Sequence, residues 1–229
     1  MVKSIRRGVT GRVAVALFLL QMKTNIISIK LPLILLTLGT ALNRLPAQEQ
    51  LPREEALKYA YAVSVNLEQL QGTPIATDVD LKRPVVVRDG EYGGMFLPEA
   101  KLTAEAIAKA PDKVVPIGQL WLHKLTPMKD GEGIAPEKLR MAKVTGADGA
   151  EVQVPQCALG MRRNAAGSLE LLIYGKTAEP LLAVPVSAAG DKAEAGIALE
   201  AERVDNAGQV TVILFGKYKA KLSFTDPEA

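Results

Sequence analysis

A series of short apolar runs begins near residue 73 and continues to the end of the sequence. Gly, Pro, Asp or Asn interrupts these runs about every ten residues, and several runs alternate apolar with polar residues. Short, regularly spaced strands with turn residues between them are typical of a sandwich or a barrel. We therefore predict that residues 73–229 form a mainly β domain, an antiparallel sandwich or partly open barrel of about eight to ten short strands.

The individual runs give the expected strands. Residues 85–87 lead into Asp89-Gly90, a pair typical of hairpin turns, and residues 95–97 would form the returning strand. Further strands are predicted at residues 75–81, 117–125, 139–144, 152–154, 157–161, 181–186 and 218–224, and the longest loop at residues 127–136.

The last predicted strand, residues 218–224, alternates regularly. Its apolar side chains would face inward, while Lys217, Lys219 and Lys221 would face outward. A row of lysines on one face is a common protection of a sheet edge against the addition of further strands. We interpret these lysines as edge protection and not as a binding site.

Two helices are expected beside the strands. Within residues 48–72, a helix over residues 52–70 would place apolar side chains every three to four positions, with a proline near its first turn and a glycine after its last apolar position. A strand over residues 61–67 is the alternative, because apolar residues also alternate there. Thr103 precedes an Ala-rich run and predicts a short capped helix near residues 103–110.

Residues 164–186 and 205–227 resemble each other at an offset of 41 residues. Each copy reads as a polar turn, a strong strand, an aromatic-Gly-Lys break and a further strand. We interpret them as an internal repeat that forms two equivalent hairpins, with a chance resemblance between strand-turn segments as the alternative. Gly175 and Gly216 would supply a bulge or a tight turn, where a side chain would obstruct the backbone.

The amino-terminal segment has the composition of a signal peptide. Residues 31–42 carry no charge, Lys23 and Lys30 precede them, and Ala47 follows. The run is shorter than the roughly 20 apolar residues that a membrane-spanning helix needs. We predict a signal peptide over residues 1–47, with export to the periplasm or the medium after cleavage near Ala47; cleavage after Ala41 is the alternative.

The start of the signal peptide is a separate question. A second apolar run, residues 13–20, is separated from the first by polar residues, so that the two do not form one span. Met22 stands directly before Lys23, and a start at Met22 would give a signal peptide of ordinary length. We therefore hypothesise that residues 1–21 are an upstream extension.

Removal of the signal peptide reverses the net charge of the chain. The whole sequence has 28 basic and 25 acidic residues, for a net charge of +3, but seven of the basic residues and none of the acidic ones precede Gln48. The remaining 21 basic and 25 acidic residues give −4. A mildly acidic domain argues against a nucleic-acid partner and against an anionic membrane surface, so the signal peptide is the only membrane-directed segment that we predict.

The chain offers few residues for catalysis. With one cysteine, Cys157, it has no intrachain disulfide, and burial of this small apolar residue is the favoured interpretation. His123 is the only histidine, and a nucleophilic pair with Cys157 lacks any supporting motif. Asp78 and Asp80 could share a strand face and bind a hard cation, but the pattern lacks the glycine and glutamate of a calcium loop. We predict no catalytic residues, no metal ligands and no cofactor.

The candidates for a binding surface are therefore aromatic. Tyr92 lies in a Gly-rich stretch, and Trp121 and His123 would share one face of a strand, with leucines on the other face. We propose these three residues as weak candidates for binding an unknown protein or a component of the cell envelope.

The predicted function is that of an exported, non-catalytic β-rich domain that acts by binding or assembly. The alternative is a small exported hydrolase that uses acidic residues, with or without His123. A concave pocket that contains His123 or a pair of carboxylates would favour the hydrolase, whereas a flat or grooved surface would favour binding.

Overall fold

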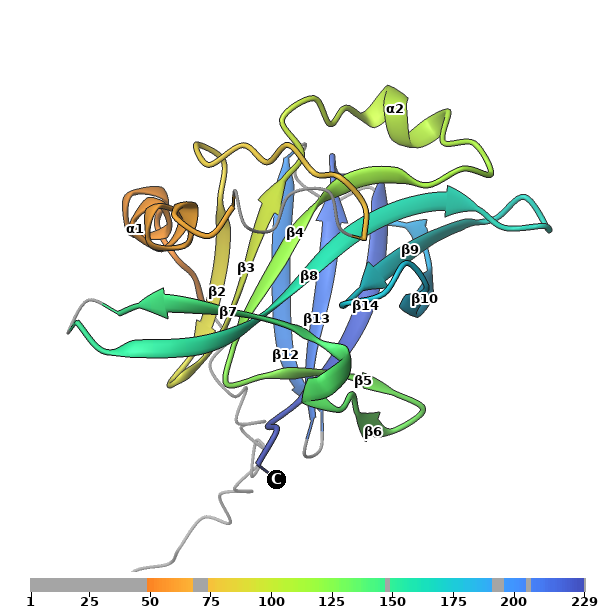
Figure 1. Ribbon diagram of the computed structural model, residues 1–229. Coiled ribbons are helices and arrows are strands. Elements are labelled where there is room, and N and C mark those ends of the chain that lie inside the picture. Colours follow the sequence, from red (N-terminus) through yellow and green to blue (C-terminus); the bar gives the residue numbers. More distant parts are fainter. Residues whose placement is uncertain (1–48, 68–73, 147–148, 191–195, 205–206, 229) are drawn as a thin grey trace, which may run out of the picture. The chain divides into compact units, whose positions relative to one another are not determined.

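Two antiparallel β-sheets pack face to face and account for most of the domain (Figure 1). The computed structural model describes residues 49–67, 74–146, 149–190, 196–204 and 207–228. The predicted signal peptide and its upstream extension lie outside the described residues, as do residues 68–70 of the predicted first helix. The described residues all fall within one compact unit, Asn43–Ala229.

The first sheet runs across the front of the view in Figure 1. In spatial order it contains β1 (Glu49–Gln50), β2 (Val85–Asp89), β3 (Tyr92–Pro98), β4 (Val115–His123), β8 (Glu151–Arg163), β9 (Leu169–Tyr174) and β10 (Pro180–Pro185), and β7 (Arg140–Thr145) also pairs with β8.

The second sheet lies behind the first (Figure 1). It contains β12 (Ile197–Val204), β13 (Ala207–Leu214), β14 (Tyr218–Thr225), β5 (Thr126–Lys129) and β6 (Glu132–Gly133), and β11 (Ser187–Ala188) also pairs with β14. A short 3-10 helix, η2 (Pro136–Lys138), connects β6 to β7.

The mainly β, antiparallel, sandwich-like architecture is therefore confirmed. The described residues form more strands than the predicted eight to ten, partly because three of them (β1, β6 and β11) have only two residues. The β2–β3 hairpin was predicted from its turn, in which Gly90 has a φ of 61°. The strands predicted at residues 152–154 and 157–161 are one continuous strand, β8.

The prediction of a strand at residues 75–81 is wrong. This segment makes only one isolated bridge, between Val79 and Glu99. Asp80 instead folds the chain locally, since its carboxylate accepts hydrogen bonds from Arg83 Nε (2.7 Å) and from the backbone N–H of Lys82 (2.9 Å). Aspartate commonly bonds to nearby backbone in this way, which favours turns over strands.

Two further predictions about the strands are also wrong. Residues 127–136, predicted as a loop, contain most of the β5–β6 hairpin and the start of η2. The strand at 218–224 is not an edge, because β14 pairs with β13 on one side and with β5 and β11 on the other.

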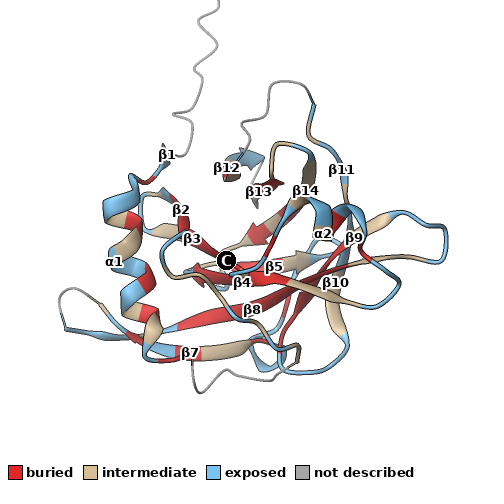
Figure 2. Cartoon of the chain, turned by 90° about the horizontal axis from the view of Figure 1, so that it is seen from above, coloured by how far each residue is buried: buried red, intermediate tan, exposed pale blue. Residues whose placement is uncertain are grey.

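The two predicted helices are present. Helix α1 (Arg53–Ser64) buries Ala56, Ala60 and Val63, which repeat at three to four residues, so the alternative strand at residues 61–67 is excluded. Figure 2 shows this buried stripe turned toward the first sheet. In α2 (Ala104–Ala108), the Thr103 hydroxyl accepts a hydrogen bond from the N–H of Ala106 (3.1 Å), as an N-cap residue does.

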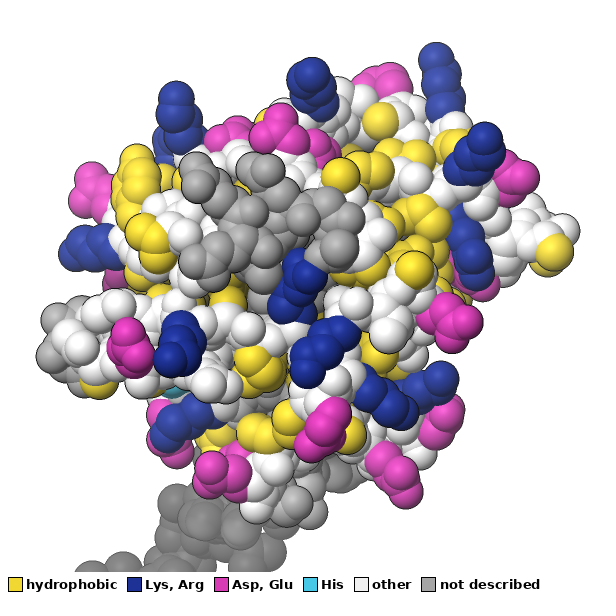
Figure 3. All heavy atoms as spheres, viewed as in Figure 1, with side chains coloured by type: hydrophobic (Ala, Val, Ile, Leu, Met, Phe, Trp, Pro, Cys, Tyr) yellow, Lys and Arg dark blue, Asp and Glu magenta, His cyan; other side chains and the backbone are white. Residues whose placement is uncertain are grey.

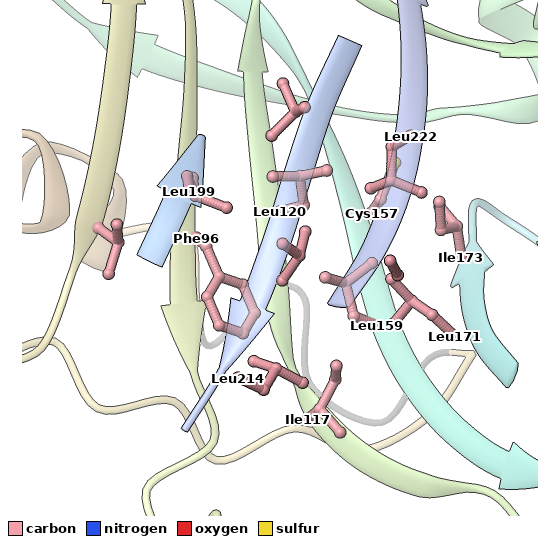
Figure 4. Packing of buried hydrophobic residues seen from close by; sticks show 14 of the residues in the cluster. Phe96, Ile117, Leu120, Cys157, Leu159, Leu171, Ile173, Leu199, Leu214 and Leu222 are labelled. Carbon is pink, nitrogen blue, oxygen red and sulfur yellow. The ribbon is translucent and has the colours of Figure 1, made fainter. Parts of the chain in front are cut away.

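Apolar side chains fill two layers of the molecule. The larger cluster lies between the sheets and receives the inner faces of β2, β3, β4, β8, β9, β12, β13 and β14 (Figure 4). A second cluster lies on the outer face of the first sheet, beneath α1. We call the face of each sheet that is turned toward the other sheet its inner face.

The two segments of the predicted repeat form the hairpins β9–β10 and β13–β14, one in each sheet. A Cβ atom on Gly175 would lie 2.1 Å from the carbonyl oxygen of Lys138, so a side chain would obstruct the backbone there. Gly216 has a φ of 64° in the turn before β14. Gly175 therefore leaves no room for a side chain, and Gly216 has a backbone conformation that favours glycine.

Candidate ligand-binding cavity

A cavity of about 330 Å³ lies between the inner faces of β2, β3 and β4 and those of β12, β13 and β14. Its apolar lining comes from both sheets and includes Val87, Leu122, Leu199, Val210 and Phe224. These residues are on the inner faces because they belong to the cluster between the sheets. The volume is at the lower end of the range of about 300–1,000 Å³ that is usual for small-molecule sites.

Small residues on the inner faces leave this space open. Gly94 lies between the inward-facing residues Tyr92 and Phe96 of β3, and Gly208 pairs with Phe224 across β13 and β14. Ala201 of β12, which pairs with Val210, is also small and lines the cavity. A larger side chain at any of these positions would extend into the cavity.

Neither Gly94 nor Gly208 is required by the backbone. A Cβ atom on Gly94 would lie 3.9 Å from Leu122 Cδ2, and one on Gly208 would lie 3.9 Å from the carbonyl oxygen of Phe224; both are ordinary contacts. Neither residue has a positive φ. By contrast, a Cβ atom on Gly118 would lie 2.2 Å from the carbonyl oxygen of Leu97. Glycine weakens a strand, so its presence at Gly94 and Gly208 without a steric reason points to the empty space itself.

Two polar contacts cross from one sheet to the other at the partly exposed end of the cavity. The Tyr92 hydroxyl donates a hydrogen bond to Asp226 Oδ2 (2.7 Å), and Arg203 Nη2 donates one to Asp89 Oδ2 (3.3 Å). Tyr92 and Asp89 belong to the first sheet, whereas Arg203 belongs to β12 and Asp226 directly follows β14 in the second sheet. The cavity is thus apolar inside and polar at its exposed end.

The ionisation of the Tyr92–Asp226 pair follows from its hydrogen bonds. The backbone N–H of Glu228 and then the Tyr92 hydroxyl hold the pKa of Asp226 below its usual value. The bond to Asp226 in turn raises the pKa of Tyr92, because the phenol must keep its proton to donate. At neutral pH, Asp226 is an anion and Tyr92 is a neutral donor.

The structure does not bring the three predicted binding residues together. Tyr92 lines the cavity. Trp121 is buried on the opposite face of the sheet, in the cluster beneath α1, and its Nε1 donates to Gln119 Oε1 (3.1 Å). His123 shares the strand face of Trp121, as predicted, and is exposed.

Cys157 is fully buried between the sheets, and burial raises the pKa of its thiol to about 12. Because Cys157 faces inward and His123 faces outward, the two do not form a nucleophilic pair. Asp78 and Asp80 do not share a strand face, since neither lies in a strand. Among the residues that the structure describes, no group of three or more His, Cys, Asp or Glu side chains could hold a metal ion.

Sequence reasoning missed most of the cavity. Tyr92 is the one predicted residue that lines it, while Asp89, Arg203 and Asp226 were not singled out as site residues. A usable signal was present in the glycines at inward positions of otherwise apolar strands, Gly94 and Gly208.

Comparisons with protein-family models, with curated proteins and with solved structures found no match to this chain. No helix in the described part of the chain is both long enough and apolar enough to span a membrane.

Proposed function

We propose that this protein is a non-catalytic binding domain that takes up a small, largely apolar ligand between its two sheets. The observation that carries the proposal is the open space at Gly94 and Gly208, where neither backbone conformation nor packing calls for glycine. Apolar surface transferred from water into such a cavity gains about 25 cal/mol per Å². The lining from Val87, Leu122 and Phe224 supplies this apolar surface.

Export is part of the proposal and rests on the sequence alone. The basic residues, the apolar run at residues 31–42 and Ala47 support cleavage of a signal peptide and activity in the periplasm or the medium. Amino-terminal sequencing of the mature protein should give Gln48 as the first residue. A mature protein that retains residues 31–42 would contradict this part of the proposal.

A protein or envelope partner remains a second prediction, and a nucleic-acid partner is not proposed. Figure 3 shows acidic and basic side chains interspersed over one face of the domain. Nucleic-acid binding proteins instead concentrate basic side chains on one face. The mixed charges of this face fit the mildly acidic net charge of the processed chain.

The alternative, a hydrolase that uses acidic residues, is favoured by one observation: Asp89 and Asp226 both line a concave cavity. A pair of carboxylates works in hydrolysis when one of them keeps a proton as the general acid. Asp226 has a lowered pKa, and Asp89 is ion-paired with Arg203. His123 faces away from the cavity. These features support binding over hydrolysis.

Calorimetric titration with octanol tests the binding function, using the processed domain and a pair of glycine variants. Gly94→Val adds methyl groups in the cavity, whereas Gly196→Val adds them at an exposed glycine with no atom within 4 Å of its Cβ position. We expect saturable binding of octanol to the wild type and to Gly196→Val, and at least about tenfold weaker binding to Gly94→Val. Equal binding to both variants, or no saturable binding to the wild type, would refute the proposal.

A further inference from the structure

The charged residues that line the cavity differ in how their charges are paired. Arg203 is paired with Asp89 (3.3 Å), and Arg88, which also lines the cavity, is paired with Glu55 (3.7 Å). The positive charges of the lining are therefore already matched by carboxylates.

Asp226 is different, because its hydrogen-bond partners are neutral. Its two carboxylate oxygens accept from the Tyr92 hydroxyl (2.7 Å) and from the backbone N–H of Glu228 (2.9 Å). Lys124 lies near enough to favour the anion, but its ammonium group is bonded to Glu91. Within the described residues, Asp226 is thus the carboxylate of the lining that has no ion-pair partner.

We infer that the ligand of this cavity carries a basic nitrogen, and that its protonated amine pairs with Asp226 while its apolar body occupies the space beside Gly94 and Gly208. This inference rests on the proposed binding function and names the chemical class of the ligand. A carboxylate accepts from several donors at once, so the bonds from Tyr92 and Glu228 leave Asp226 able to accept from an ammonium group.

Aromatic rings in the lining favour the same head group. Tyr92 and Phe224 both line the cavity, and Tyr92 contacts Asp226 directly. A cation over the face of an aromatic ring is attracted by the negative electrostatic potential of that face. An ammonium group bonded to Asp226 is thereby placed next to an aromatic ring.

The charges of the lining disfavour a ligand with an anionic head group. Its best partner in the lining is Arg203, which already binds Asp89. A ligand carboxylate would have to compete with Asp89 and would lie in a cavity that Asp226 also lines. Like charges in such a site repel each other, which favours an amine over an acid.

The test compares octylamine, octanol and octanoate, which share an apolar body and differ in head group, by calorimetric titration at neutral pH. We expect octylamine to bind the wild type about tenfold more tightly than octanol, and octanoate to bind most weakly. In Asp226→Asn the advantage of octylamine over octanol should disappear, so that the two compounds bind this variant with about equal affinity.

Glu228→Gln is the matched control. It removes one negative charge, as Asp226→Asn does, but the Glu228 side chain does not line the cavity. It should keep most of the preference for octylamine. Equal loss in the two variants would mean that overall charge, and not pairing with Asp226, selects the amine, and the inference would fail. Octanol or octanoate binding as tightly as octylamine would also overturn it, yet would leave the binding function intact. If none of the three compounds binds, the binding function itself is refuted.

Discussion

Alanine substitutions at Gly118 and Gly94, which lie on neighbouring strands, should have different effects on stability. The difference distinguishes a glycine that the backbone requires from a glycine that keeps the cavity open. Gly118 lies in β4, where the pairing with β8 shifts its register, and it has a φ of 145°. A Cβ atom there would lie 2.2 Å from the carbonyl oxygen of Leu97 and 2.8 Å from Phe96 Cε2. Gly94 lies in β3, and a Cβ atom there would make only ordinary contacts at 3.9 Å.

The expected losses of stability follow from these distances. In Gly118→Ala, a φ that side chains rarely adopt costs about 1–3 kcal/mol, and the overlap with Leu97 costs about 1–3 kcal/mol more. The free energy of unfolding should therefore fall by about 2–6 kcal/mol. In Gly94→Ala neither penalty applies, and the lower entropy of the unfolded chain contributes about 0.4–1 kcal/mol in favour of the variant. Its stability should stay equal to that of the wild type or rise slightly.

Unfolding in urea, followed by tryptophan fluorescence, measures both effects. Trp121 is the only tryptophan of the chain and is buried beneath α1, so its emission reports on loss of the native packing. With a urea dependence of about 2 kcal/mol per M, the midpoint of Gly118→Ala should fall by about 1–3 M. If Gly94→Ala lowers the midpoint as much as Gly118→Ala, then Gly94 is structural and the main support for the binding function is lost.

Three further predictions concern single residues. Cys157, buried and with a thiol pKa of about 12, should not react with a thiol reagent at about pH 8 until urea unfolds the domain, and rapid reaction of the native protein would contradict its placement. Thr103→Ala should lower the free energy of unfolding by about 1 kcal/mol through loss of the α2 cap, whereas Thr103→Ser should retain most of it. The pKa of Asp80 is lowered chiefly by its hydrogen bond from Arg83, so its stabilising contribution is complete above its unfolded pKa and is lost as the pH falls through the folded value. Between about pH 5 and pH 2 the urea midpoint of the wild type should therefore fall more steeply than that of Asp80→Asn, and parallel curves would show that the bond contributes nothing.

Some elements of the fold could be predicted from a few neighbouring residues in the sequence. The Asp89-Gly90 pair predicted the β2–β3 hairpin, and Thr103 predicted the start of α2, because turns and caps depend on residues close in sequence. The β5–β6 hairpin carried the same kind of signal and was missed. Asp130 and Gly131 form its turn with φ values of 55° and 87°, as expected for an Asp-Gly turn of type I′.

Alternation alone was a weaker guide, because it does not show whether a backbone partner exists. Residues 75–81 alternate, but Asp80 bonds within its own turn, and the segment therefore stays outside the sheets. Residues 218–224 alternate as predicted, yet on the side away from β13 their neighbours β5 and β11 come from other parts of the chain. The glycines at inward positions signal that space is left open, but which residues surround that space was not predictable, since Gly94 meets Ala201 and Gly208 only through the packing of two sheets.

The position of the cavity follows from how the two sheets are joined. At one edge the chain passes directly from β10 in the first sheet to β11 in the second, and backbone hydrogen bonds from Val186 and Ala189 hold this corner. Near the other edge, β2 and β12 are neighbours that belong to different sheets, and the half-exposed Asp89–Arg203 pair connects them.

Backbone hydrogen bonds hold the corner between β10 and β11, whereas side chains connect β2 to β12. The exposed ion pair at the junction of β2 and β12 contributes only about 0–1 kcal/mol. Small residues can therefore line the inner faces near this junction without loss of any strand pairing. Near this junction the backbone pairing of the strands does not depend on the size of the side chains that line the cavity. The strand pairing therefore determines the sandwich, whereas the small residues Gly94, Ala201 and Gly208 determine whether the sandwich has room for a ligand.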